Sequence, residues 1–358
     1  MNTREKIVMY RTVFVTLMVV ALTVLVLFNT IYNKGSNFEA GMQRPNAEPE
    51  LSPEAPVASI TEPQDSHQLI RLTFGGTCTP SSLLGSSVYG TFNSMKNEVG
   101  TAYFFSRLSD IFTADDLTLV GCNSVISDAN ELSLSDDSGE WYLTTSDSIE
   151  IFTSAGVDAL SLACPRNMDY GWVGYAALKS TIKETELMWG DASNAIYKSF
   201  GDIDVGIYCC ILNESDRDAI ISWIRSAAER NDFVVLYICD TEGDSAFPSE
   251  TKISLLRAYV DAGADLIVAT NGKELQHSEK YGDGYIIYSL GALLDGTTKY
   301  PERLTALLQV SLKANDGEIF EVSYDFIPVA TYDDDHSWQP YVLEDGADKK
   351  SVLAFFTN

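Results

Sequence analysis

Short apolar runs alternate with amphipathic segments through the middle of the chain. The runs are rich in β-branched and aromatic residues, and polar or turn-forming residues bound each of them. Alternation of this kind is typical of an α/β fold, in which helices cover the faces of a largely parallel sheet. The predicted strands are residues 70–74, 117–120, 157–163, 204–212, 233–239, 264–270 and 285–290.

Two of the intervening helices have recognisable start signals. Ser215 and Asp218 form a capping-box pattern ahead of an apolar stripe that begins at Ile220. A second helix is predicted to start near Ser249 and to end at Gly263. The apolar faces of both helices are interpreted as core.

Beyond Tyr300 the pattern changes to two strand-like segments, residues 307–313 and 319–329. They flank a turn sequence at residues 315–317 (Asn-Asp-Gly), which is typical of a hairpin. We therefore expect a second, antiparallel sheet in this region.

The N-terminal region contains 21 consecutive uncharged residues, 12–32. At helical rise they would extend about 31 Å, close to the thickness of the hydrocarbon core of a bilayer. Three basic residues precede the run and only Lys34 closely follows it, which predicts a signal anchor with a cytoplasmic N-terminus and an extracytoplasmic remainder. A cleaved signal peptide is the alternative, although no A-x-A-like site follows Phe28.

The segment after this run contains five of the eleven prolines in the chain, which indicates an extended tether. The predicted organisation is a cytoplasmic N-terminus (1–11), a transmembrane signal anchor (12–32), a Pro/Glu-rich extracytoplasmic linker (33–67), a folded domain (68–345) and a C-terminal tail (346–358).

Charge changes the list of possible partners. The chain of 358 residues has a formal charge of −27, and since residues 1–34 hold four basic residues and one acidic residue, the remainder carries −30. Such a domain lacks the basic footprint of a nucleic-acid-binding protein and repels long polyanions. Nucleic acid is therefore excluded as a partner.

Several framework segments of the domain resemble the CapA family of poly-gamma-glutamate capsule synthesis proteins. The similarity covers most of residues 69–330, and its most specific feature is the spacing between the two segments at 261–268 and 288–291. The matching segments are LTF at 72–74, ADDLTLV at 114–120, AGVDALSLA at 155–163, DYG at 169–171, DAGADLIV at 261–268, LQ at 275–276 and YSLG at 288–291. The resemblance implies a calcineurin-like metallophosphoesterase fold, with two packed mixed sheets, flanking helices and a dinuclear metal site on the loops at the strand ends.

The loops that would hold this metal differ from the family pattern. Where the family has V-G-D, N-L-E, A-N-N-H, H-W-G and G-H-H-P-H, this chain has residues 75–77 (GGT), 121–123 (GCN), 163–166 (ACPR), 239–241 (CDT) and 269–273 (ATNGK). None of the three histidines, His67, His277 and His336, occupies an aligned ligand position. Because a divalent pair needs several carboxylate or imidazole ligands, we expect that the metal centre is lost, with no catalytic residues and no cofactor.

The degenerate former metal and ligand pocket is thus predicted to comprise Thr77, Gly121, Asn123, Cys164, Arg166, Cys239, Thr270, Asn271 and Lys273. Arg166 and Lys273 would either bind an anionic group or form internal salt bridges with Asp169, Asp240 or Glu242. A calcium site at Asp240, Glu242 and Asp244 is a weaker alternative to a solvated acidic loop.

The cysteines leave further alternatives open. Cys164 and Cys239 could form a thiolate metal site, and Cys78, Cys122, Cys164, Cys209, Cys210 and Cys239 could form disulfides if the domain is extracytoplasmic. The simplest interpretation is that they are small buried residues at strand ends. The retained segments at residues 169–171 and 289–291 are interpreted as shaping turns.

The resemblance leads to a functional hypothesis. The chain would be a membrane-anchored binding or scaffold component of capsule, poly-gamma-glutamate or related envelope polymer synthesis, without metal-dependent hydrolysis. Its partners would be membrane polymer-synthase or envelope proteins, with an anionic small ligand or polymer as a further possibility. The alternatives are an active phosphoester or gamma-glutamyl hydrolase with a non-standard site, and a ligand-sensing envelope protein.

Overall fold

The computed structural model describes residues 67–84, 89–128, 132, 141–240, 245–271 and 273–357. These residues belong to one compact unit, 63–358. The predicted cytoplasmic N-terminus, membrane span and nearly all of the linker lie outside the described residues. Within the described residues no helix is long and apolar enough to cross a bilayer.

The first sheet has eight strands in the order β17-β16-β15-β1-β3-β6-β7, with β14 also paired to β1. The contacts of β1 with β3 and β14 are parallel, and its contact with β15 is antiparallel. The strands are β1 (Gln68–Thr79), β3 (Leu117–Cys122), β6 (Ala159–Ser161), β7 (Met188–Gly190), β14 (Ala292–Asp295), β15 (Leu304–Asn315), β16 (Glu318–Ala330) and β17 (Tyr341–Val342).

The second sheet has six strands in the order β12-β13-β11-β10-β9-β8. Its four central strands are parallel, and both edge strands run antiparallel to their neighbours. The strands are β8 (Ile196–Phe200), β9 (Ile203–Ile211), β10 (Phe233–Cys239), β11 (Leu266–Thr270), β12 (Leu275–Tyr281) and β13 (Gly284–Leu290). A small third sheet joins β2 (Ser82–Leu83), β5 (Tyr142–Thr144) and β4 (Val125–Ile126).

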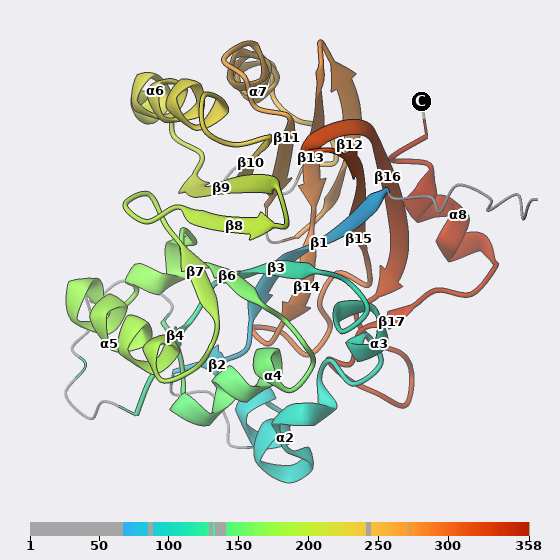
Figure 1. The fold of residues 1–358 in the computed structure, drawn as a ribbon. Coiled ribbons are helices and arrows are strands. Elements are labelled where there is room, and N and C mark those ends of the chain that lie inside the picture. Colours follow the sequence, from blue (N-terminus) through green and yellow to red (C-terminus); the bar gives the residue numbers. More distant parts are fainter. Residues whose placement is uncertain are drawn as a thin grey trace, which may run out of the picture. The chain divides into compact units, whose positions relative to one another are not determined.

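The two large sheets pack face to face, and helices cover their outer faces (Figure 1). Strand β10 illustrates how one strand contacts both the other sheet and the covering helices. Val235 and Tyr237 face the other sheet, whereas Val234 and Leu236 pack under two helices, α6 (Arg217–Ala228) and α7 (Glu250–Asp261). This follows because successive side chains of a strand point to opposite faces. The helices are α2 (Phe92–Val99), α3 (Ser109–Phe112), α4 (Glu150–Thr153), α5 (Gly171–Lys183), α6 (Arg217–Ala228), α7 (Glu250–Asp261) and α8 (Ala347–Leu353), with 3-10 turns at Thr101–Tyr103, Ser146–Ile149, Pro165–Met168 and Glu214–Asp216.

The mixed α/β architecture with two packed sheets confirms the predicted fold at this level, and a strand is present at each of the seven predicted positions. The helix predicted near Ser249 is α7, with the Ser249 side chain accepting a hydrogen bond from the Lys252 N–H. The cap predicted at Ser215 is wrong. The Asn213 side chain instead accepts a hydrogen bond from the Ser215 N–H, and this caps a 3-10 turn that precedes α6.

Two further expectations need correction. The hairpin of β15 and β16 exists, but it extends the first sheet by pairing with β1, so it is not a separate antiparallel sheet.

The segment 346–358 is not a mere tail. Helix α8 and the residues after it pack on the core, where the Phe356 ring stacks on Phe326 with 3.9 Å between centroids. Apolar anchors at Val352 and Phe356 explain this docking.

Candidate functional site

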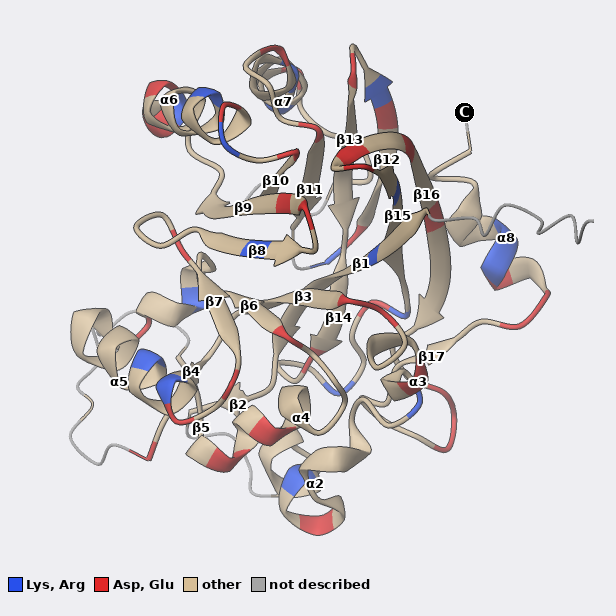
Figure 2. Ribbon diagram, viewed as in Figure 1, with Lys and Arg blue, Asp and Glu red and all other residues tan. Residues whose placement is uncertain are grey.

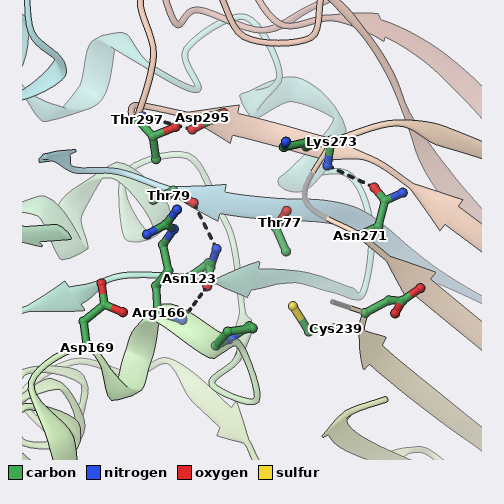
Figure 3. A pocket seen from close by; sticks show the side chains of 12 residues that line it. Thr77, Thr79, Asn123, Arg166, Asp169, Cys239, Asn271, Lys273, Asp295 and Thr297 are labelled. Atoms are coloured by element: carbon green, nitrogen blue, oxygen red, sulfur yellow. Dashed lines mark hydrogen bonds between the residues drawn. The ribbon is translucent and has the colours of Figure 1, made fainter. Parts of the chain in front are cut away.

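A cavity of about 400 Å³ opens where strands of both sheets end (Figure 3). Its lining residues come from the last residues of strands β1, β3, β6, β10, β11 and β14 or from the loops that follow them. This is expected because the carboxyl ends of parallel strands meet at one edge of a sheet. We call it the polar pocket. Its lining residues are Thr77, Thr79, Asn123, Pro165, Arg166, Asp169, Cys239, Asp240, Asn271, Lys273, Asp295 and Thr297.

Most of the predicted pocket residues are brought together here. Six of the nine line the cavity: Thr77, Asn123, Arg166, Cys239, Asn271 and Lys273. The other three lie in the adjoining strand ends and loops. Thr270 Oγ1 donates to the Gly291 carbonyl at 2.6 Å and accepts from the Thr77 N–H at 3.3 Å, so it holds β1 against β11.

Gly121 and Cys164 are also adjacent to the lining. A Cβ at Gly121 would lie 3.0 Å from the Tyr237 hydroxyl oxygen and 3.4 Å from Cys164 Sγ, so this position has little room for a larger residue. Cys164 lines a different cavity, described below.

Asn123 organises the loops of the first sheet around the pocket. Its Oδ1 accepts from the Arg166 backbone N–H at 3.0 Å, and its Nδ2 donates to Thr79 Oγ1 at 3.3 Å (Figure 3). The Arg166 guanidinium carbon lies 3.9 Å from the centroid of the Tyr142 ring, a cation-π geometry. This single amide therefore ties three strand-end loops together.

The acidic residues of the pocket have internal partners. Asp169 accepts from the Tyr142 N–H at 3.1 Å, and Asp295 accepts from the Thr297 N–H at 2.9 Å. Burial raises the pKa of Asp169 above its usual value, although the hydrogen bond from Tyr142 and the charge of Arg166 oppose the shift.

Asp240 forms a buried ion pair that the sequence did not predict. Lys252 of α7 places its Nζ 2.5 Å from Asp240 Oδ2, and the side chains are 0% and 1% exposed. The same ammonium donates to Gln276 Oε1 at 2.9 Å and to the Tyr288 carbonyl at 2.7 Å. Glu242 and Asp244, the other members of the predicted calcium cluster, lie outside the described residues.

Asp295 and Thr297 were also missed, because strand β14 was not predicted. The apolar run from Ala292 to Leu294 is short, and it ends in an Asp-Gly pair that indicates a turn. Pairing of β14 with β1 carries this turn to the pocket. A search for polar residues at the ends of short apolar runs could have found it.

All six cysteines are buried free thiols. Burial raises the pKa of Cys164 well above the ordinary value of a thiol, and the neighbouring Cys239 raises it further. Burial likewise raises the pKa of Cys122 to about 12. Among the residues that the structure describes, no group of three or more His, Cys, Asp or Glu side chains could hold a metal ion, whereas a structural zinc site needs four ligands.

These pKa shifts predict slow thiol chemistry. At pH 8, the native protein should react with a disulfide reagent at Cys122 and Cys164 at least about a hundredfold more slowly than the unfolded chain, because so little thiolate forms. Stopped-flow thiol titration with and without denaturant, followed by peptide mapping, measures this. Rapid native labelling of Cys164 would contradict the prediction and restore a thiolate ligand.

The donor set does not fit a dinuclear metal centre. The carboxylates of the pocket are committed to Lys252, Tyr142 and Thr297, and the cations Arg166 and Lys273 line the same cavity. The three histidines lie elsewhere: His67 at the start of β1, His277 on β12 and His336 hydrogen-bonded to Asp333. The two cations in the lining weaken its attraction for a divalent ion.

The retained YSLG segment has a structural explanation. Ser289 Oγ donates to the Glu274 carbonyl at 2.7 Å and accepts from the Asn271 and Gly291 N–H groups at 3.2 and 3.0 Å. Gly291 has φ +72°, which favours glycine. This set of bonds joins the end of β13 to the loop that carries Lys273, which agrees with the interpretation that the segment shapes the turn where the strand ends.

Comparisons with known proteins agree with these motifs. The family model described as bacterial capsule synthesis protein PGA_cap matches residues 191–297, a stretch that contains the pocket residues from Cys239 to Thr297. The capsule biosynthesis protein CapA of Bacillus anthracis is 27% identical over 204 residues, which covers 49% of this chain and 49% of that protein. This chain thus spans about half the length of that relative.

The PGA biosynthesis protein CapA of Bacillus subtilis (strain 168) is 24% identical over 279 residues, with coverage of 70% of this chain and 72% of the relative. Among solved structures, a hypothetical protein from Thermus thermophilus superposes with a TM-score of 0.44 at 12% identity, covering 72% of this chain and 99% of that chain. A novel phosphatase from Mycoplasma pneumoniae gives a TM-score of 0.42 at 13% identity, with 73% and 94% coverage.

The family model overlaps the second sheet and its pocket loops, and the longer relative extends the similarity over most of the domain. Three of the framework segments, at 261–268, 275–276 and 288–291, lie inside the stretch that the family model matches. This chain is thus similar to bacterial capsule synthesis proteins of the CapA type.

Proposed function

We propose that this protein is a membrane-anchored, extracytoplasmic component of capsule polymer synthesis, and that its polar pocket binds a ligand without hydrolysing it. The observation that carries the proposal is that side chains supply the positive charge in and behind the pocket. Arg166 and Lys273 line the cavity, and Lys252 neutralises Asp240 from behind. Side-chain cations thus stand where the resemblance implies metal ions.

The charges of the lining suggest which part of a polymer would bind. Two cations, Arg166 and Lys273, share the cavity with the carboxylates Asp169 and Asp295. A mixed lining complements a group that carries both an ammonium and a carboxylate, as the amino end of a gamma-glutamyl chain does. Binding one chain end also avoids the repulsion between a long polyanion and a domain as acidic as this one, whose acidic positions are spread over its helices and loops (Figure 2).

The proposal predicts metal-independent binding. With the full chain in lipid nanodiscs, calorimetry against a short gamma-glutamyl oligomer should give the same affinity with and without chelator. Arg166→Met and Lys273→Met should each weaken binding by about tenfold or more, since each removes a charge-assisted contact. Lys280→Met, which removes an exposed cation outside the pocket, is the matched control.

Three results would contradict the proposal. The first is stoichiometric binding of manganese, iron or zinc with chelator-sensitive turnover of a phosphodiester. The second is recovery of the full chain in the soluble fraction of the producing cells, which would contradict the anchoring. The third is full affinity retained in both Arg166→Met and Lys273→Met, which would remove the pocket as the binding site.

A further inference from the structure

A second and larger cavity, of about 700 Å³, lies between α5 and the start of α6. It adjoins the polar pocket across the 3-10 turn Pro165–Met168, whose residues Pro165 and Arg166 line one cavity and Met168 the other. We call it the apolar cavity. Its lining residues are Leu162, Ala163, Cys164, Met168, Trp172, Tyr175, Ala176, Lys179, Asp191, Ala192, Ser193, Tyr208, Cys210, Ile211, Asp216, Ala219 and Ile220.

The polar groups in its wall are largely bonded to one another. Asp191 accepts from the Tyr175 hydroxyl, from Lys179 Nζ at 3.2 Å, and from the N–H and hydroxyl of Ser193 at 2.7 Å each. The Tyr208 hydroxyl donates to the Ala192 carbonyl at 3.0 Å. A ligand rich in hydrogen-bonding groups would therefore gain little here, whereas a hydrocarbon would bury the apolar remainder of the wall.

The mouth of the cavity is apolar as well. Trp172 is 75% exposed and the adjacent Val173 is 63% exposed, and Ala176 one turn later is also exposed. The first two turns of α5 thus turn apolar side chains to the outside, where a surface helix normally carries polar ones. An exposed apolar ridge beside a cavity marks an interaction site.

Lys179 adds a feature of membrane interfaces. Its Nζ lies 4.7 Å from the centroid of the Tyr175 ring and 4.5 Å from that of Trp189. The Lys179 side chain is 25% exposed, and aromatic rings beside a basic side chain are typical of the boundary between lipid and water.

We infer that the apolar cavity takes the hydrocarbon chain of a membrane lipid. The inference rests on the membrane anchoring in the proposed function, since a linker of residues 33–67 can reach at most about 120 Å and keeps the domain beside the bilayer. The exposed Trp172 and Val173 meet the membrane surface, and a chain that enters between α5 and α6 replaces water along the apolar wall. The cavity volume lies in the range of pockets that enclose most of a small ligand.

Photo-crosslinking tests this inference. The full chain is reconstituted in vesicles of phosphatidylethanolamine and phosphatidylglycerol that contain a trace of phosphatidylcholine with a diazirine near the end of one acyl chain. Mass spectrometry should find adducts on Met168, Trp172 and Ile220, and the same label on the head group should give few adducts there. Residues 12–32 should be labelled in the same sample.

Matched substitutions separate the cavity from the surface around it. Ala176→Phe and Ala219→Phe each place a ring in the mouth of the cavity. Each should lower the yield of cavity adducts by about tenfold, the loss of affinity expected when two methylenes of the acyl chain are no longer buried. Ser180→Phe on α5 and Asp218→Phe on α6 add the same ring at exposed positions outside the lining and should leave the adducts unchanged.

The outcomes distinguish this inference from the proposed function. Adducts confined to residues 12–32 would overturn the lipid site and support the anchor. Adducts at the cavity without any at 12–32 would support the lipid site and contradict the anchor. Cavity adducts that disappear as the protein concentration in the vesicles is raised would assign the cavity to self-association and overturn the inference.

Discussion

Replacing Lys252 by methionine is expected to lower the free energy of unfolding by about 3–5 kcal/mol. The substitution leaves Asp240 without its cation in a place where both side chains are almost fully buried. It also removes the donor to Gln276 Oε1 and to the Tyr288 carbonyl. Urea denaturation followed by tryptophan fluorescence measures the change, because all five tryptophans lie at or beyond position 141.

A double variant identifies the cause. Lys252→Met combined with Asp240→Leu removes both charges, so it should regain the part of the loss that comes from the uncompensated carboxylate. It should not regain the part that comes from the two acceptors left by Lys252, each of which costs about 1–3 kcal/mol when buried and unpaired. If the single and double variants unfold at the same urea concentration, Asp240 does not depend on Lys252.

The same ion pair shows where sequence-based prediction ends. Lys252 occupies the first turn of a correctly predicted amphipathic helix, and a lysine at such a position is normally solvated. Its burial depends on α7 packing over β12 and β13, which brings Gln276 and Tyr288 within its reach. Contacts between elements of this kind leave no periodicity in the sequence.

The strands were predictable because each is a run of buried apolar residues with clear ends. Strand β10, for example, is observed as predicted, at 233–239, and every one of its residues is buried. The placement of the C-terminal hairpin was not predictable, because its alternating pattern fits the edge of either sheet. Pairing of β15 with β1 through seven residues decided it.

Much of the polar pocket could be predicted, since strand-end loops converge whatever residues they carry. That convergence brought Thr77, Asn123 and Lys273 together from segments far apart in the sequence. The apolar cavity could not be predicted in this way. It forms between the outer part of α5 and the start of α6, and the exposure of Trp172 and Val173 follows from packing alone.

Gly76→Ala is expected to destabilise the protein by about 3 kcal/mol or more. A Cβ at Gly76 would lie 2.1 Å from the Gly291 carbonyl oxygen and 3.2 Å from the Leu293 nitrogen, both backbone atoms that cannot move aside cheaply. The clash falls beside the register shift in β1 between Thr77 and Cys78, where β14 pairs. Urea denaturation followed by tryptophan fluorescence provides the measurement.

A glycine without such contacts is the control. Gly346 has φ 178°, an extended conformation open to any residue, and a Cβ there would meet nothing closer than 3.9 Å. Gly346→Ala should therefore change stability by less than about 1 kcal/mol. An unchanged midpoint for Gly76→Ala would contradict the close approach of β1 to Gly291. If the clash is instead relieved by parting β1 from β14, Thr77 and Asp295 move with these strands, and binding in the polar pocket should weaken together with stability.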